Sequence, residues 1–120
     1  MVIPVEIVLK GRDFAVTASL ELPHGEPSTW DDFAVRDILI EILRAIDRAE
    51  NPTAPPDRVV ALRGFSWIVE PMDGDVVLAI EIPMGAAVAG PFKIDQKTLE
   101  TTITRVMQIE RQLFSSTTVH

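Results

Sequence analysis

One short stretch of the chain gathers side chains that could bind a metal ion. His24, Glu26, Asp31 and Asp32 all lie within residues 24–32. An imidazole and several carboxylates together can hold a divalent cation, but this spacing is not typical of a metal site. Two aspartates just before an amphipathic segment also suit the positive end of a helix. We therefore expect no metal site, with Asp31 and Asp32 at a helix N-terminus and His24 and Glu26 in solvent.

Two glutamates occupy matching places in the two halves of the chain. Glu21 lies in LELPHG and Glu81 in IEIPMG, 60 residues further on. On neighbouring strands their carboxyl groups could work as an acid and a base. As outward-facing strand residues they need no chemical role. No nucleophile stands with a base at a recognisable spacing, so we expect no catalytic residue and no cofactor.

A segment of small residues separates the last expected strand from the last expected helix. Gly85 and Gly90 in GAAVAGP have the spacing of a phosphate-binding loop. Such a loop needs a lysine next and then a serine or threonine, whereas Pro91 stands in the lysine position here. We therefore expect residues 84–91 to form a loop without a phosphate site.

Composition limits the class of protein. The chain has 120 residues, enough for one domain with a single core. Eleven basic and eighteen acidic residues give a net charge of −7, which opposes binding to nucleic acid or to an anionic membrane. No cysteine is present, so disulfides and zinc–cysteine sites are excluded. The first ten residues do not resemble a signal peptide, and we expect a cytoplasmic protein.

Apolar periodicity predicts the elements. A period of two predicts a hairpin of strands over 3–9 and 13–22, and a period of 3.6 predicts an amphipathic helix from about residue 30 to 50. In the second half, two strands over 58–70 and about 75–82 precede a helix over about 96–114. Residues 51–57 are expected to be a linker and 115–120 a flexible tail. The order ββαββα predicts an α+β two-layer sandwich, a four-stranded antiparallel sheet with two helices on one face.

The two halves resemble each other. Shifting the sequence by 60 residues aligns the expected pseudo-repeats 1–50 and 58–114, most closely at LELPHG and IEIPMG. Matching apolar patterns can also arise because two segments fold alike. We expect a single domain over 1–120 with a possible internal pseudo-twofold axis.

Several apolar residues are expected outside the core. The strand phase places Val8, Val60, Leu62, Ile68 and Val77 on the sheet face without helices, and scattered exposed valines are the alternative interpretation. Three more residues are expected to form a protein-binding edge near the first helix, namely Trp30, Phe33 and Ile40. For Trp30, burial against the start of the helix is an equally good interpretation.

One polar pair is a candidate for burial. Glu110 falls near the middle of the apolar stripe of the last helix, and Arg63 has the inward phase of the third strand. A carboxylate buried there would need such a partner. If the helix instead extends beyond the sheet, Glu110 is in solvent.

Together these features predict a small acidic protein-interaction module, an adaptor, chaperone-like or regulatory subunit. We expect it to act as a homo-oligomer and to bind another protein, because the outer strand residues are unusually apolar. The alternative is a small-molecule-binding protein or an enzyme with a site between the sheet and the 84–91 loop.

Overall fold

The computed structural model of the chain describes residues 1–55 and 60–118. Its elements follow the order ββαβββα, with one short 3-10 helix, η1. They are β1 (Val2–Leu9), β2 (Ala15–Glu21), η1 (Pro27–Thr29), α1 (Asp32–Glu50), β3 (Ser66–Met72), β4 (Asp75–Ile82), β5 (Gly85–Phe92) and α2 (Gln96–Thr118).

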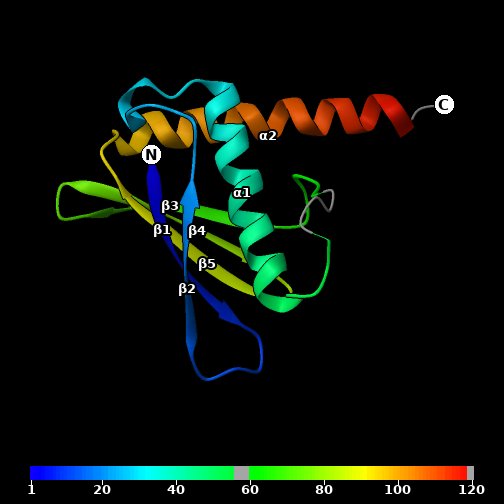
Figure 1. The fold of residues 1–120 in the computed structure, drawn as a ribbon. Coiled ribbons are helices and arrows are strands. Elements are labelled where there is room, and N and C mark those ends of the chain that lie inside the picture. Colours follow the sequence, from blue (N-terminus) through cyan, green and yellow to red (C-terminus); the bar gives the residue numbers. More distant parts are fainter. Residues whose placement is uncertain (56–59, 119–120) are drawn as a thin grey trace.

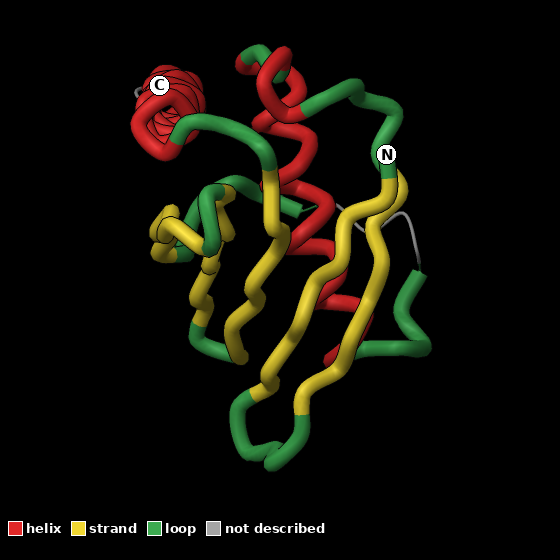
Figure 2. The backbone as a smooth tube through the Cα atoms, turned by 90° about the vertical axis from the view of Figure 1, so that its left-hand side faces the viewer, coloured by secondary structure: helices red, strands yellow, loops and turns green. Residues whose placement is uncertain are grey.

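The strands form one antiparallel sheet in the order β2-β1-β5-β4-β3. Pairing of β1 with β5 joins the N-terminal hairpin to the C-terminal three-stranded unit. The helix α1 contacts β1, β2 and β5, and α2 contacts β3 and α1. Both helices lie over the same side of the sheet, and within the described residues no helix covers the other side (Figures 1 and 2). The α+β two-layer architecture is confirmed, with five strands where the sequence predicted four.

The additional strand is β5, so the prediction of a loop over 84–91 is wrong. Alternate residues of this segment face the helices, and Ala87 and Ala89 are fully buried there. Their small side chains fill the centre of the sheet beneath α1. Gly85 also needs its missing side chain, because a Cβ at this position would overlap the carbonyl oxygen of Val8 on β1. The glycine and alanines of this segment resemble a loop in composition. They are small because β5 lies close to β1 and to the helices.

The strand predicted over 58–70 is shorter in the structure. The strand β3 begins at Ser66, and residues 60–65 form an irregular connection in which Gly64 has φ +75°. Residues 58 and 59 lie outside the described residues, as do 56 and 57 of the expected linker. Val60 and Leu62 consequently do not belong to the sheet.

The helix predictions are accurate at the apolar face and less accurate at the ends. The expected core side of α1 is buried, including Ile38, Leu39 and Ile42. Asp31 caps this helix by accepting a hydrogen bond from the amide of Ala34 at 2.9 Å. The helix α2 continues to Thr118, so residues 115–118 are helical and not a tail, while 119–120 lie outside the described residues. The C-terminal half of α2 extends past α1 (Figure 1).

The sheet order is incompatible with the expected pseudo-twofold axis. The sequence match pairs β2 with β4, but β2 is an edge strand whereas β4 lies between β5 and β3. A twofold axis through the central strand β5 would exchange β2 with β3 instead. The segment that matches β5 in the first half contains the loop and the short helix η1. The two halves thus share a local pattern without a symmetric arrangement.

The core lies between the inner side of the sheet and the two helices. Its largest fully buried side chains come from every layer, and they include Ile7 of β1, Leu78 of β4, Phe92 of β5, Leu39 of α1 and Ile103 of α2. Neither helix, over the described residues, is long and apolar enough to cross a bilayer.

Candidate functional site

The sheet face opposite α1 and α2, called here the outer sheet face, is covered by no element of the described residues (Figure 2). Antiparallel register fixes which residues lie side by side on it. One row across all five strands contains Thr17, Glu6, Val88, Ala79 and Ile68. The adjacent row contains Ala15, Val8, Ala86, Glu81 and Ser66. Residues far apart in the chain thereby form one continuous surface.

The centre of the outer sheet face is apolar. Val8 on β1 is 47% exposed, Ile68 on β3 is 51% exposed and Val88 on β5 is 43% exposed. Between them Val77 and Ala79 of β4 are half-buried, although no other element lies on them. Neighbouring apolar side chains left in water on one face are typical of an interaction surface.

Carboxylates surround this apolar centre. Glu6, Glu21, Glu70 and Glu81 are all exposed and alternate with buried strand residues, so they share the outer sheet face. The five strands contain no lysine or arginine. The nearest basic residues along the chain are Lys10, which directly follows β1, and Lys93, which directly follows β5. The outer sheet face therefore combines apolar side chains with strongly negative charge.

The structure brings only some of the expected interaction residues together. Val8, Ile68 and Val77 lie on the outer sheet face as predicted from strand phase. Leu62 is buried, at 7% exposure, and Val60 is half-buried near the helices, so both predictions are wrong. The strand that would have carried them begins only at Ser66.

The expected aromatic edge near the first helix does not form. Trp30 is buried at 9% exposure, where its ring meets Phe92 edge-on at 5.2 Å and its indole N–H donates to the carbonyl of Gly25 at 3.0 Å. The alternative interpretation, burial against the start of the helix, describes Trp30 correctly. Phe33 is 78% exposed as predicted, whereas Ile40 is half-buried and packs against the core. Phe33 thus stands alone, far from the outer sheet face.

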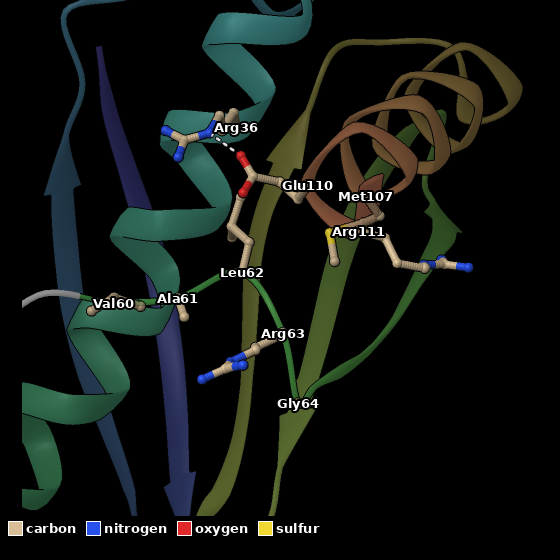
Figure 3. Close-up of a pocket in the computed structure, with 9 residues that line it drawn as sticks. All are labelled: Arg36, Val60, Ala61, Leu62, Arg63, Gly64, Met107, Glu110 and Arg111. Atoms are coloured by element: carbon tan, nitrogen blue, oxygen red, sulfur yellow. Dashed lines mark hydrogen bonds and ion pairs between the residues drawn. The ribbon is translucent and has the colours of Figure 1, made fainter. Parts of the chain in front are cut away.

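The expected pair of Arg63 with Glu110 is also corrected. Glu110 accepts from Nε of Arg36 on α1 at 2.5 Å, and its side chain remains 23% exposed (Figure 3). Arg63 is exposed in the 60–65 connection. Because α1 and α2 contact each other, the carboxylate meets an arginine of α1 that lies 74 residues away in sequence. The pair is therefore neither buried nor made by the expected partner.

A pocket of about 450 Å³ opens between α1, α2 and the connection at 60–64. Three arginines line it, one from each of these segments, namely Arg36, Arg63 and Arg111 (Figure 3). Glu110 supplies the one carboxylate of the lining, and apolar atoms come from Val60, Leu62 and Met107. The pocket could accept a small anionic molecule, although Arg36 is already paired with Glu110 and Arg63 also makes an interaction of its own.

The side chains considered for metal binding make structural contacts. His24 Nε2 lies 3.1 Å from Oδ2 of Asp37, and Asp31 caps α1. Asp32 is bound by Arg105 of α2, and this hydrogen bond is the main reason that the pKa of Asp32 is lowered. Among the residues that the structure describes, no group of three His, Asp or Glu side chains is placed to hold a metal.

The two matching glutamates are not neighbours. Glu21 lies on β2 and Glu81 on β4, and the strands β1 and β5 separate them. An acid–base pair between them is therefore excluded by the sheet order.

Val88 and Ala86 lie near the middle of the outer sheet face, although neither was among the expected interaction residues. The segment 85–92 resembled a loop because of its glycines and alanines. The usual signal of a strand was absent, because Ala86, Ala87, Val88 and Ala89 are all apolar and give no alternation of polar and apolar residues.

Comparisons of the chain with protein-family models, with curated proteins and with solved structures gave no match.

Proposed function

We propose that the protein is a small protein-interaction module that binds its partner through the outer sheet face. The observation that carries this proposal is the exposure of Val8, Ile68 and Val88 side by side with half-buried Val77 and Ala79 on a face that no helix covers. Burying such a surface against a partner removes apolar area from water, which is the main favourable contribution to most protein association.

The polar side chains support an interaction role over a catalytic one. Asp31 and Asp32 each make a contact that stabilises the start of α1 or joins α1 to α2. A catalytic carboxylate would instead point into a cleft with a perturbed pKa caused by burial or a like charge. The exposed carboxylates lie on an open sheet, where water screens them.

Self-association through the same face is the competing proposal. Two copies placed face to face would bring Glu6, Glu70 and Glu81 of each near the same residues of the other. Like charges repel across such an interface and must be compensated by apolar burial or by salt. This repulsion favours a different protein as the partner. The expected homo-oligomer stays a proposal, which a measurement of the molar mass in solution tests.

The proposal is tested by comparing three proteins in affinity capture from the source cells. They are the wild type, the outer-face variant Val88→Lys/Ile68→Lys, and Phe33→Lys as the matched control, because Phe33 is exposed on the helix side. We expect the same partner to be captured by the wild type and the control and lost by the outer-face variant. Calorimetric titration of the purified partner then measures the loss of affinity in the outer-face variant. Equal binding to all three proteins would contradict the proposal.

A second candidate function is the binding of a small anion in the pocket between α1, α2 and residues 60–64. Three arginines and one glutamate line this pocket, in an otherwise acidic protein. Arginines are suited to bidentate contacts with carboxylates and phosphates. We expect citrate or inorganic phosphate to raise the melting temperature of the wild type and not of Arg111→Ala. An unchanged melting temperature in the wild type would exclude this function for those anions.

A further inference from the structure

We infer that the partner of the outer sheet face is a basic amphipathic helix, a segment with an apolar stripe flanked by lysine or arginine. This inference rests on the proposed function, because it specifies the chemistry of the partner for the same surface.

Small side chains occupy the middle of the outer sheet face. Val77 and Ala79 on β4 and Ala86 and Val88 on β5 form an apolar strip along two paired strands. The strands on either side, β1 and β3, are three inter-strand steps apart, or about 14 Å. An α-helix with its side chains is about 10 to 12 Å wide. A helix lying along the apolar strip would therefore have β1 on one side and β3 on the other.

Carboxylates lie on both of these flanks. Glu6 on β1 is directly across from Val88, and Glu70 on β3 is directly across from Val77. Glu81 stands on β4 next to Ala86, at one end of the apolar strip. A helix whose apolar stripe covers the apolar strip would place its flanking side chains close to Glu6 and Glu70. Lysine or arginine at those positions matches the surface, and glutamate or aspartate does not.

The charge of the whole chain is concentrated on this face. Five of the eighteen acidic residues lie in the strands, where no basic residue is found, whereas the remaining thirteen share the rest of the chain with eleven basic residues. Outside the strands the charges nearly balance, with Lys10 and Lys93 directly adjoining β1 and β5. A basic segment is directed to the outer sheet face by this difference, and anionic partners such as nucleic acid or acidic lipid are repelled from it.

The probe for the first test is a pair of labelled synthetic peptides with the same helical leucine stripe, one flanked by lysine and the other by glutamate. Fluorescence anisotropy measures their binding to the full chain, and circular dichroism measures the helix content of the bound peptide. We expect the lysine peptide to bind with a gain in helix content and the glutamate peptide not to bind. Higher salt should weaken the binding of the lysine peptide.

Two protein variants of equal net charge locate the binding site. Glu6→Gln/Glu70→Gln/Glu81→Gln removes three charges from the outer sheet face, and Glu26→Gln/Glu50→Gln/Glu100→Gln removes three from the helix side. We expect the first variant to lose about tenfold in affinity for the lysine peptide, as three surface ion pairs together can supply. The second should change the affinity less than about twofold, since distant exposed charges are screened.

A third variant tests the apolar strip without changing charge. Ala79→Gln places a longer polar side chain at the centre of the apolar strip. We expect it to lower the affinity for the lysine peptide as strongly as the loss of the three glutamates does. Its melting temperature, compared with the wild type, shows that the variant folds.

The possible outcomes separate this inference from the proposed function. Equal binding of both peptides, lost in Ala79→Gln, overturns the basic partner and still supports the outer sheet face as the interaction surface. Binding of the lysine peptide that neither Ala79→Gln nor the outer-face glutamate variant weakens contradicts both. Failure of the lysine peptide to bind overturns the inference, while the capture experiment with Val88→Lys/Ile68→Lys decides the proposed function independently.

Discussion

Arg105 on α2 holds the carboxylate of Asp32, in the first turn of α1, through both of its oxygens. The Nε atom of Arg105 lies 3.0 Å from Oδ1 and 2.9 Å from Oδ2, and Nη2 lies 2.6 Å from Oδ1. The two residues are 73 positions apart in sequence, so the contact fixes the start of one helix against the middle of the other. The negative charge of Asp32 also suits the positive N-terminal end of α1.

This contact predicts a pH dependence of stability. The hydrogen bond with Arg105 lowers the pKa of Asp32 below its ordinary value of 3.8. The folded state therefore binds this proton less readily than the unfolded chain does, and the resulting stabilisation is present above pH 3.8 and lost as the pH falls through the lowered pKa of the folded state. We expect Asp32→Asn to lower the melting temperature slightly at pH 6 and to differ little from the wild type near pH 2. Thermal melts followed by circular dichroism between pH 6 and pH 2 measure the difference.

Arg105→Ala is the control for the cause of this shift. Without the guanidinium group the pKa of Asp32 should return toward its ordinary value, so this variant should show the same reduced acid dependence as Asp32→Asn. A wild-type acid dependence in either variant would place the titrating group elsewhere in the protein.

The Arg36–Glu110 contact predicts a measurable coupling in stability. Both side chains are partly exposed, at 44% and 23%, so the ion pair should contribute about 0.2 to 1 kcal/mol to the free energy of unfolding. A double-mutant cycle with Arg36→Ala and Glu110→Gln, measured by urea denaturation, isolates this contribution. We expect the corresponding cycle between Arg63 and Glu110 to give a smaller coupling. A larger value for the Arg63 cycle would restore the pairing that the sequence alone suggests.

Much of the fold could be predicted from the sequence because local pattern determines it. The apolar face of α1 and the alternation of β1 and β4 follow directly from the periods of 3.6 and two. The strand β5 could not be predicted from the sequence. Its buried residues, Ala87 and Ala89, are small and do not stand out from their neighbours in hydrophobicity. Their burial beneath α1 becomes visible only once the helix packs on the sheet.

The composition of the candidate site could likewise be predicted only in part, because it depends on which elements become neighbours. Strand phase placed Val8, Ile68 and Val77 on the outer sheet face, and the structure agrees. Which strands are neighbours is a long-range property, so the proximity of Glu6 to Val88 could not be derived from the residues alone. The partner of Glu110 was missed for the same reason, since Arg36 reaches it only after the helices pack.

Adjacent alanines on β5 predict opposite responses to a larger side chain. Ala87 is fully buried beneath the helices, so Ala87→Leu should overpack the core and cost about 1 to 3 kcal/mol in the free energy of unfolding. Ala86 lies half-buried on the outer sheet face, where Ala86→Leu should change stability by less than about 0.5 kcal/mol. Urea denaturation of the two variants compares them directly. A larger cost for Ala86→Leu would mean that a second copy or another element covers the outer sheet face.

Self-association through the outer sheet face predicts an unusual response to salt. Two such faces brought together carry carboxylates of the same sign, so low ionic strength should oppose pairing and high ionic strength should permit it. We expect light scattering after size-exclusion chromatography to give the 13.3 kDa monomer at low salt. Any dimer that forms through this face should increase with salt and disappear in Val88→Lys/Ile68→Lys. A dimer that is already complete at low salt and survives in this variant would place the interface on another surface, and the outer sheet face would then be free in the assembled protein to receive the basic helix.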